Sequence, residues 1–502
     1  MTSQISTENT NFFAEVLEQL RNCSQVNIQA QWFYHQEDLD IATVMSSDWE
    51  NWTPTQLNEK DNVSWDGGKK LLWLAQKLVV PQDLNGYDLL GLRLKLGLLW
   101  WADSAQVYVN GKLVVEGDLF DCFPRVLVST SVKPRDEFFV ALRLVSPGHC
   151  DGALVKSFLV YESGDEMFPE PGFVADELEV VRGYLEVYEP GKLDVFNHEV
   201  TKYTKEERGE KKGKRGRKEL DGLLRLLRDR LVELKIGNNI RSKVSLLGHA
   251  HLDMAWLWPV SETWNAAQST FESVLKLQED FSELIFCHST PALYAWVEEN
   301  RPDLFAAIQK KVAEGVWEVL GGFWIEPELN LISGESLVRQ LLYGQRYVLE
   351  KFGKISPIVW VPDTFGFCWT LPQFMQQGGI EYFVTQKLRW NDTNKFPYGV
   401  FWWQSPDGSK VLSLMSAPVG EGVDAVKMAS YAREWEKQTG LNDALWLPGV
   451  GDHGGGPTRD MLEIAQRWQK SPFFPKLEFT TAENYLNQLQ SPITNSQLPI
   501  PN

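Results

Sequence analysis

The chain has 502 residues, which at roughly 100–200 residues per domain predicts two to four domains. It carries 49 Lys plus Arg and 67 Asp plus Glu, a formal net charge of −18. This acidic balance argues against a nucleic-acid-binding protein, which needs a basic face to neutralise phosphates. Hydrophobic residues make up 43% of the chain, so it can bury a large core and is not a disordered protein. The 21 Trp fit either a core or aromatic stacking on sugars, and composition leaves both open.

Nothing in the sequence indicates export or membrane insertion. The N-terminus lacks the basic start and apolar core of a secretory signal. The most apolar stretch, Leu89 to Trp101, is broken by Arg93 and Lys95 and is shorter than the roughly 20 residues that span a bilayer. The cysteines are odd in number and scattered, which favours a reducing compartment over a disulfide framework: Cys23, Cys122, Cys150, Cys287 and Cys368. We therefore predict a cytoplasmic chain with no membrane or nucleic-acid partner.

Within the first 165 residues, the spacing of apolar residues changes at about residue 25. Residues 1–24 predict an N-terminal amphipathic helix, since Phe13, Val16, Leu17 and Leu20 recur at helical spacing. Residues 25–165 alternate with a period of two, and Asn110-Gly111 between two apolar runs is a strong hairpin signal. Short strands separated by turn residues predict an antiparallel, jelly-roll-like β-sandwich domain.

Residues 166–240 are predicted to form a linker and a helix with a basic run. The run from Lys202 to Lys218 holds nine basic residues, three acidic residues and three glycines. A nucleic-acid or membrane surface is one interpretation, but a solvated linker is favoured because the rest of the chain is acidic. A leucine-rich helix, Leu220 to Lys235, follows.

Residues 241–490 are predicted to be an α/β catalytic domain, with residues 491–502 as a tail. Apolar strands alternate there with amphipathic helices, which is typical of a parallel sheet covered by helices. An open doubly wound sheet and a closed barrel both fit this pattern, and seven strands in about 250 residues favour a seven-stranded β/α barrel. The predicted strands are Val244–Gly248, Leu284–Cys287, Trp317–Leu320, Pro357–Val361, Tyr382–Thr385, Val411–Met415 and Leu445–Leu447.

Acidic and imidazole side chains follow four of these strands, at the edge where parallel α/β folds place their ligand sites. His251 and Asp253 are two residues apart, so on an extended segment both project to one side. With Glu328 and His453 they make two nitrogen and two oxygen ligands, a set that suits Zn²⁺ or a similar divalent ion. The alternative is that these histidines are buried in the core with their hydrogen bonds satisfied.

Two carboxylates in this region have the pattern of a glycosidase. Glu328 and Asp363 each lie in a loop stiffened by proline, and a pair of carboxylates across a pocket can cleave a glycosidic bond. Asp363 alone fits a helix N-cap equally well. Ser333, ahead of Glu335, is interpreted as the start of a helix.

Five motifs resemble glycoside hydrolase family 38, the α-mannosidases, and they are most similar to its cytosolic and bacterial branch. The resemblance covers about residues 240–490, and the predicted sandwich is similar to the N-terminal domain of that branch. The motifs are GHAHLDMAWLWP (Gly248 to Pro259), EPELNLISGESLVRQ (Glu326 to Gln340), VPDTFGF (Val361 to Phe367), QKLRWNDTNKFP (Gln386 to Pro397) and GVGDHGGGPTRD (Gly449 to Asp460).

The resemblance implies a retaining α-mannosidase with one zinc ion per chain, acting on terminal α-mannosidic bonds of oligosaccharides. By position in the motifs, His251, Asp253 and His453 match metal ligands, and Glu328 matches the carboxylate that binds metal and acts as nucleophile. Asp363 matches the general acid/base. Trp256 and Asp452 match positions in the substrate site.

Two departures from the family pattern keep alternatives open. The family usually has Asp at the position of Glu328, so Glu326 is a second candidate for the nucleophile. The chain ends at Asn502, whereas family members continue through further helical and β-sandwich domains. We therefore keep a catalytically impaired mannose-binding fragment and a metal-dependent polysaccharide deacetylase as alternatives. A separate C-terminal polypeptide or a homo-oligomer are the candidate protein partners.

Overall fold

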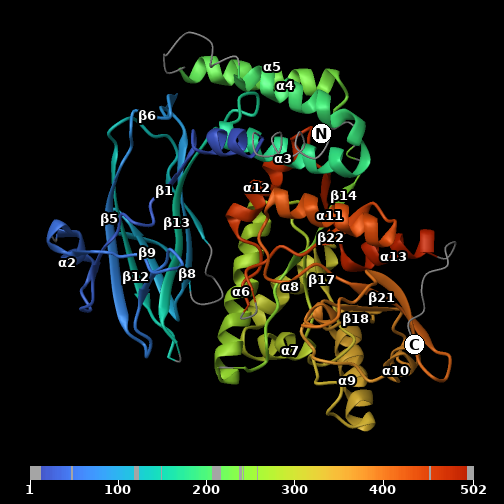
Figure 1. Ribbon diagram of the computed structural model, residues 1–502. Helices are drawn as coiled ribbons and strands as arrows, with labels where there is room; N and C mark the ends of the chain where they lie inside the picture. The colour runs from blue at the N-terminus through green and yellow to red at the C-terminus, as the bar shows by residue number, and fades with distance from the viewer. Residues whose placement is uncertain are drawn as a thin grey trace. The chain divides into compact units, whose positions relative to one another are not determined.

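The structure is a computed structural model that describes residues 13–46, 49–117, 124–148, 150–205, 216–236, 240, 242–256, 258–451 and 454–493. It divides into two compact units. The first unit comprises Met1–Ile240 and Lys470–Phe474, and the second comprises Arg241–Gln469 and Pro475–Asn502. Figure 1 colours the chain from blue at the N-terminus to red at the C-terminus.

Two large antiparallel sheets make up most of the β-structure of the first unit (Figure 1), as the alternating pattern predicted, and β6 (Asp83–Leu84) and β7 (Tyr87–Asp88) form a further two-stranded sheet. One sheet has the order β1 (Gln25–Asn27), β13 (Gly152–Glu162), β8 (Arg93–Trp101) and β11 (Arg125–Ser129), with β4 (Val63–Trp65) also paired to β13. The other has the order β10 (Lys112–Gly117), β9 (Ser104–Val109), β12 (Glu137–Val145), β5 (Leu71–Val79), β2 (Phe33–His35) and β3 (Thr53–Pro54).

The predicted hairpin joins β9 to β10. Asn110 and Gly111 have φ angles of 50° and 75°, and this pair of left-handed residues makes the tight turn whose twist suits a two-residue hairpin. Along β9 every second residue is buried, so one face of the strand is turned to the core. The hairpin signal in the sequence is therefore confirmed.

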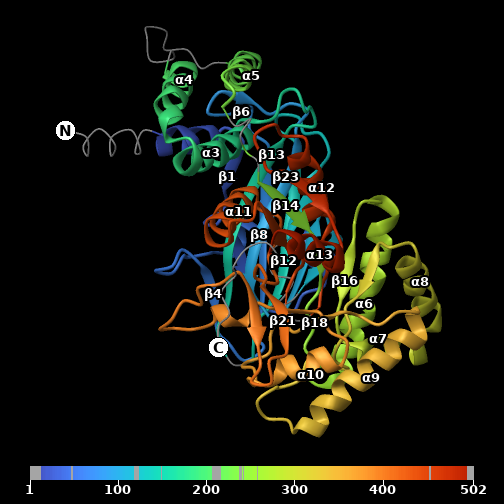
Figure 2. The same cartoon turned by 90° about the vertical axis from the view of Figure 1, so that its right-hand side faces the viewer.

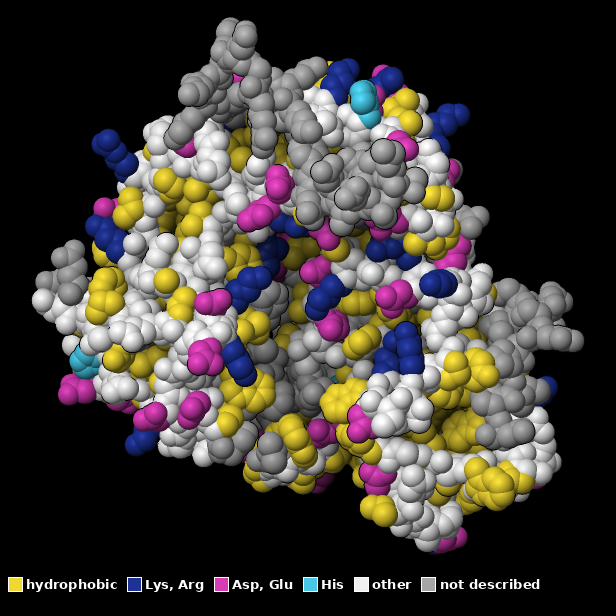
Figure 3. All heavy atoms as spheres, viewed as in Figure 1, with side chains coloured by type: hydrophobic (Ala, Val, Ile, Leu, Met, Phe, Trp, Pro, Cys, Tyr) yellow, Lys and Arg dark blue, Asp and Glu magenta, His cyan; other side chains and the backbone are white. Residues whose placement is uncertain are grey.

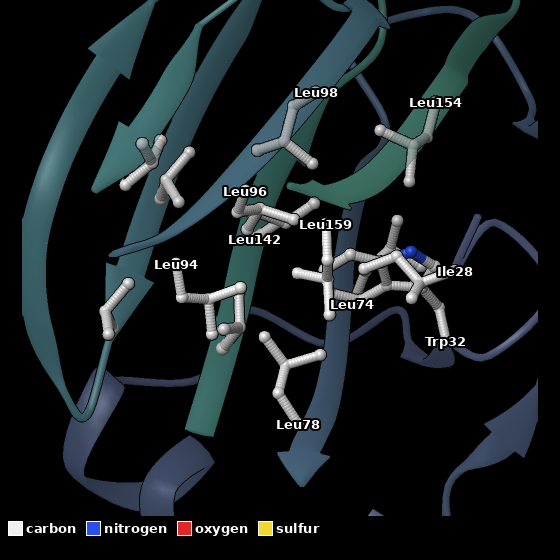
Figure 4. Close-up of a cluster of buried hydrophobic side chains, with 14 of the residues drawn as sticks. Ile28, Trp32, Leu74, Leu78, Leu94, Leu96, Leu98, Leu142, Leu154 and Leu159 are labelled. Carbon is white, nitrogen blue, oxygen red and sulfur yellow. The ribbon is translucent and has the colours of Figure 1, made fainter. Parts of the chain in front are cut away.

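Leucine side chains fill the core of these sheets (Figure 4). Leu74 comes from β5, Leu96 and Leu98 from β8, and Leu142 from β12, and each is at most 2% exposed. Burying one such side chain contributes roughly 1.5–3 kcal/mol, so this cluster alone supplies much of the stability of the sheets.

Helices form a second core in the first unit. Residues 13–21 are helical, and they are followed later in the chain by α3 (Pro171–Tyr188), α4 (Leu193–Lys205) and α5 (Arg217–Glu233). Their apolar faces share one cluster that includes Phe13, Leu178, Phe196 and Leu227. Within the basic run, residues 206–215 lie outside the described residues.

The second unit contains parallel sheets that alternate with helices, as its strand–helix pattern predicted. The first sheet has the order β22 (Asp443–Trp446), β14 (Lys243–Leu246) and β23 (Lys476–Phe479), and the second has β15 (Gly248–His249), β16 (Phe286–His288) and β17 (Trp317–Val319). The third has β18 (Ile358–Trp360), β19 (Tyr382–Thr385), β21 (Lys410–Met415) and β20 (Val400–Gln404), of which β20 alone is antiparallel within that sheet.

Helices lie beside these strands (Figure 2), with α8 against β17, α11 against β22 and α12 against β23. The helices are α6 (Val260–Asp280), α7 (Pro291–Asn300), α8 (Pro302–Ala313), α9 (Gly334–Phe352), α10 (Leu371–Gln377), α11 (Ala425–Thr439), α12 (Arg459–Gln469) and α13 (Ala482–Ile493). Every residue of β16, β17 and β18 is buried, as expected of strands covered on both faces. Their side chains are apolar except for His288 and Glu318.

The sequence missed two strands of the second unit. In β20 the run Val400 to Trp403 is apolar, but it leads straight into β21 as an antiparallel neighbour, without the helix that the strand–helix pattern requires. In β23 the sequence KLEF alternates charged and apolar residues over four positions, too few to give a period.

Charged side chains are mixed rather than segregated on the face in Figure 3, where Lys and Arg lie among Asp and Glu over its described part. Among the described residues, no helix has both the length and the apolar composition that crossing a membrane requires.

Candidate metal centre and active site

Three side chains from two loops of the second unit converge at the carboxyl end of the strands. His251 and Asp253 follow β15, and Asp363 follows β18. Each offers one ligand atom, and these atoms all lie within 4.8 Å of one another. His251 Nε2 is 3.3 Å from Asp253 Oδ1 and 3.9 Å from Asp363 Oδ2. This metal group, as we call these three residues, can hold a cation between one imidazole nitrogen and two carboxylate oxygens.

Backbone hydrogen bonds hold the loop that carries His251. Its carbonyl accepts the N–H of Gly454 at 2.9 Å, and the His249 N–H donates to the carbonyl of Pro448 at 3.0 Å. A side chain at Gly449 would put its Cβ 2.0 Å from the His249 carbonyl oxygen, so only glycine allows the two segments to approach this closely. The loop after β22 is therefore packed directly against the loop after β15.

A buried threonine anchors the other end of the same loop. The Thr263 hydroxyl, on the first turn of α6, contacts the carbonyl oxygens of Met254 at 2.7 Å and Asp253 at 3.1 Å. Because Thr263 is fully buried, these contacts are shielded from water. Asp253 is thereby held at a fixed distance from the start of a rigid helix.

Glu326 ties the loop after β17 to the loop that carries Asp363. Its Oε1 accepts the Asp363 N–H at 2.6 Å and the Thr364 hydroxyl at 3.0 Å. Its Oε2 lies 3.7 Å from His251 Nδ1. Burial raises the pKa of Glu326, and the attraction of His251 offsets part of that shift. Glu326 therefore orients both Asp363 and His251, and the sequence had offered it only as a second candidate nucleophile.

Sequence reasoning missed Lys387. This residue starts the short helix η3 (Lys387–Arg389) directly after β19, and its side chain is only 3% exposed. Its Nζ contacts Asp363 Oδ1, which leaves Oδ2 as the oxygen nearer His251. Its position at the end of a predicted strand, like that of His251 and Asp363, is the signal that could have identified it.

Two neutral histidines lie in the core near the site. His249 Nε2 accepts the indole N–H of Trp360 at 3.1 Å. Burial lowers the pKa of His249 well below its ordinary value, and it lowers the pKa of His288 to about 3. His249 fits the satisfied core histidine that the sequence analysis kept as the alternative to metal ligation. His288 is also buried, but its Nδ1 has no hydrogen-bond partner among the described residues.

The remaining predicted site residues are not members of the metal group or lie outside the described residues. Glu328 precedes α9 and is not among the three residues of the metal group. Its Oε1 is buried with no hydrogen-bond partner among the described residues. Trp256 is 61% exposed and packs edge-on against Trp258, with ring centroids 5.8 Å apart. Asp452 and His453 lie outside the described residues.

The side chains present fit a divalent cation. An imidazole nitrogen with carboxylate oxygens is a donor set that Zn²⁺ accepts. The buried Oε1 of Glu328 is an additional acceptor that pairing with a cation would satisfy. The structure thus supports a possible metal site at His251, Asp253 and Asp363, and it leaves the identity of the ion open.

Several of the curated relatives that match this chain are α-mannosidases. Alpha-mannosidase 2C1 of Homo sapiens is 37% identical over 262 residues, which is 51% of this chain and 25% of the relative. Alpha-mannosidase G of Dictyostelium discoideum is 36% identical over 252 residues, which is 50% of this chain and 23% of the relative. The chain spans about a quarter of the length of these relatives.

Solved structures and a family profile extend the comparison. The crystal structure of an alpha-mannosidase from Enterococcus faecalis V583 is 26% identical, with a TM-score of 0.42, over 52% of this chain and 30% of that chain. The profile described as glycosyl hydrolases family 38 N-terminal domain matches residues 241–500, slightly more than half of the 502 residues. The chain therefore belongs to glycosyl hydrolase family 38 and is a homologue of its α-mannosidases.

Proposed function

We propose that this protein is a zinc-dependent, retaining α-mannosidase that hydrolyses terminal α-mannosidic bonds of oligosaccharides. One observation carries the proposal: two loops of a family 38 chain bring ligand atoms of His251, Asp253 and Asp363 within 4.8 Å of one another. A mannoside substrate is what membership of the family implies.

We propose that one zinc ion per chain is held by His251, Asp253, Glu328 and His453. The partnerless Oε1 of Glu328 supports its inclusion, because a buried carboxylate oxygen without a donor is costly unless a cation or ligand pairs with it. When bound, zinc supplies a Lewis acid that can hold sugar hydroxyls. Trp256 and Asp452 are proposed to line the sugar site, and the exposed ring of Trp256 suits stacking on a sugar.

In the proposed reaction Glu328 attacks the anomeric carbon and forms a glycosyl–enzyme ester, while Asp363 gives a proton to the departing glycosidic oxygen. Asp363 then takes a proton from water, which displaces Glu328 with net retention. Lys387 holds Oδ1 of Asp363, so Oδ2 is the oxygen that can exchange this proton. Glu326 stays the second candidate for the nucleophile, since its Oε2 lies 3.7 Å from His251 Nδ1.

We further propose that the parallel strands close into one seven-stranded barrel, which would bring all the site loops to one rim. The support is that β22 pairs with β14 and that a parallel bridge joins Glu421, beyond β21, to Pro448, beyond β22. The domain division stays a proposal too: a helix in 1–24, a sandwich in 25–165, a linker and helix in 166–240, a catalytic domain in 241–490 and a tail in 491–502.

A cytoplasmic location is proposed from the cysteines. Among the described residues Cys150, Cys287 and Cys368 are free thiols, and free thiols persist in reducing compartments. Proposed protein partners are a C-terminal polypeptide that supplies the rest of the relatives' length or further copies of this chain.

A second candidate function is mannose binding without hydrolysis. It is favoured by the position of Glu328, which is not among the three residues of the metal group. In this case the chain binds zinc and mannose, but no carboxylate reaches the anomeric carbon.

The test combines metal content with turnover of an aryl α-mannoside by the 502-residue chain, alone and with a candidate C-terminal polypeptide. We expect one zinc per chain, turnover that a chelator abolishes and added zinc restores, and no turnover of the β-anomer. Zinc and mannose binding without turnover would select the second candidate. Release of acetate from an acetylated polysaccharide would instead identify a deacetylase.

A further inference from the structure

Highly exposed Phe and Trp side chains of the second unit lie in the loops that carry the metal group and Lys387. Among its described residues, the highly exposed Phe and Trp side chains are Trp256, Phe365, Trp369 and Trp390, at 61%, 56%, 73% and 66%. Trp256 follows β15, Phe365 and Trp369 follow β18, and Trp390 follows β19. Single exposed aromatic residues are common, but several around one site mark a surface that a ligand covers.

Lys387 fixes two of these rings in place. Its Nζ lies 3.5 Å from the ring centroid of Trp390 and 4.1 Å from that of Phe365. The two rings meet edge to face, with centroids 5.9 Å apart and planes at 87°. A buried ammonium against aromatic faces is a favourable contact, so both rings are held from the protein side while much of their surface stays in water.

The same lysine links these rings to the metal group. Its ammonium contacts both rings and also the Oδ1 of Asp363. The Trp390 N–H donates to the carbonyl of Lys387 at 3.0 Å, and the guanidinium of Arg389 donates to the carbonyl of Ser416 at 2.9 Å. The side chain of Lys387 therefore contacts both Trp390 and Asp363, and Trp390 is held in place before a ligand binds.

A cavity lies beside the segment that carries Trp390, and it is lined by the chain neighbours of Trp390 rather than by Trp390 itself. It has a volume of about 830 Å³, and its lining includes Arg389, Asn391, Asp392 and Tyr398. Small-molecule sites commonly fall in the range of about 300–1,000 Å³ and combine aromatic surface with a few polar groups. Amide and carboxylate side chains beside aromatic rings are the groups that bind sugar hydroxyls and the C–H face of a sugar.

We propose that Trp390, supported by Phe365 and Lys387, stacks on a second pyranose ring of the substrate. The chain then recognises a mannosyl residue attached to another sugar, and a mannosyl residue on a small alcohol lacks this contact. This inference rests on the proposed function, because the first ring is the mannose at the metal group.

The test measures binding of two mannosides that differ by one ring. The zinc-loaded chain is titrated with methyl α-mannoside and with an S-linked α-mannobiose, which resists hydrolysis. We expect the wild type to bind the disaccharide about tenfold more tightly, and Trp390→Ala to abolish that difference while keeping its affinity for methyl α-mannoside. Trp390→Phe, which keeps an aromatic face, should retain most of the difference. Trp101→Ala, at an exposed Trp of β8, should change neither affinity.

Three results would count against the proposal. If Trp390→Ala binds both mannosides as the wild type does, or weakens both equally, the second ring does not stack on Trp390. If the wild type binds methyl α-mannoside but gains nothing from the second ring, the inference fails and the proposed function stands. If the wild type binds neither compound, the proposed function fails, and this inference with it. Thermal unfolding checks that each variant is folded.

Discussion

The two units differ in which side chains surround their carboxylates. In the first unit, the carboxylate of Glu177 is 1% exposed and receives the guanidinium of Arg228 at 2.8 Å, and that of Glu162 contacts both Lys95 and Arg125. In the second unit, the carboxylates of Asp253, Glu326 and Asp363 surround His251, and Lys387 contacts one of them.

This difference distinguishes carboxylates that stabilise the fold from carboxylates that can bind a ligand. A carboxylate matched by an opposite charge satisfies the protein itself and has little affinity left for a ligand. A group of carboxylates around an imidazole carries excess negative charge, which a cation can neutralise. Substitutions of the carboxylates around His251 should therefore change ligand binding and turnover, whereas substitutions in the ion pairs of the first unit should change stability.

The largest expected effect is in the second unit. Glu328→Gln should lower turnover of an aryl α-mannoside by about 10³-fold or more, because an amide cannot act as the nucleophile. The temperature of unfolding should stay close to that of the wild type. Glu335→Gln is the matched control, since Glu335 is 70% exposed on the first turn of α9. Full activity in Glu328→Gln with loss of activity in Glu326→Gln would move the nucleophile to Glu326.

In the first unit we expect the reverse behaviour from Arg228→Met. This change leaves the buried carboxylate of Glu177 without its guanidinium and should reduce the free energy of unfolding by about 3–5 kcal/mol. Zinc affinity should not change. Arg225→Met, at a 45% exposed arginine on the same helix, should cost less than about 1 kcal/mol. Urea unfolding followed by circular dichroism measures both, and equal losses in the two variants would contradict the comparison.

In the second unit, titration of Glu318 should make the free energy of unfolding depend on pH. Its carboxylate accepts the N–H groups of Ala482 and Glu483 at 2.5 and 2.9 Å, yet burial raises its pKa to about 7. A raised folded-state pKa means that the folded chain binds the proton more tightly, so its stabilisation is complete below about pH 4.5 and is lost as the pH rises through 7.

We therefore expect a loss on the order of 2 kcal/mol between pH 5 and 8, measured as the free energy of unfolding. Glu318→Gln should flatten that part of the profile, because an amide does not titrate. Glu279→Gln, at an exposed position of α6, should leave the slope as it is. An unchanged slope in Glu318→Gln would assign the pH dependence to other groups.

The smallest expected effect is at a helix cap. Ser333 precedes α9, and its hydroxyl accepts the Ser336 N–H at 3.2 Å. Ser333→Ala should reduce the free energy of unfolding by about 1 kcal/mol, and Ser333→Asp should restore it. Thermal unfolding of the three proteins measures this, and a stable Ser333→Ala would show that packing of the helix outweighs its cap.

Features that depend on neighbours along the chain were predictable from the sequence. The turn at Asn110-Gly111 needs two residues with left-handed backbone conformation, and the cap at Ser333 needs a hydroxyl three residues before the backbone N–H that it accepts. Both features depend only on residues close together in the sequence. Strands buried on both faces, such as β18, are recognisable because every position must be apolar. Because these residues follow predicted strands, the sequence also identified His251, Asp253 and Asp363 as candidate site residues.

What only the tertiary structure decided is how residues distant in the chain meet. Glu326 bonds to the backbone of Asp363, 37 residues away, and Lys387 reaches the same carboxylate from 24 residues away. No local pattern encodes these contacts, because they depend on how loops after separate strands pack together. The sequence by itself thus determined most of the strands and helices, though not β20 and β23, and the kinds of side chain at their ends. The three-dimensional packing decided which of those side chains share a charge, and hence which can share an ion.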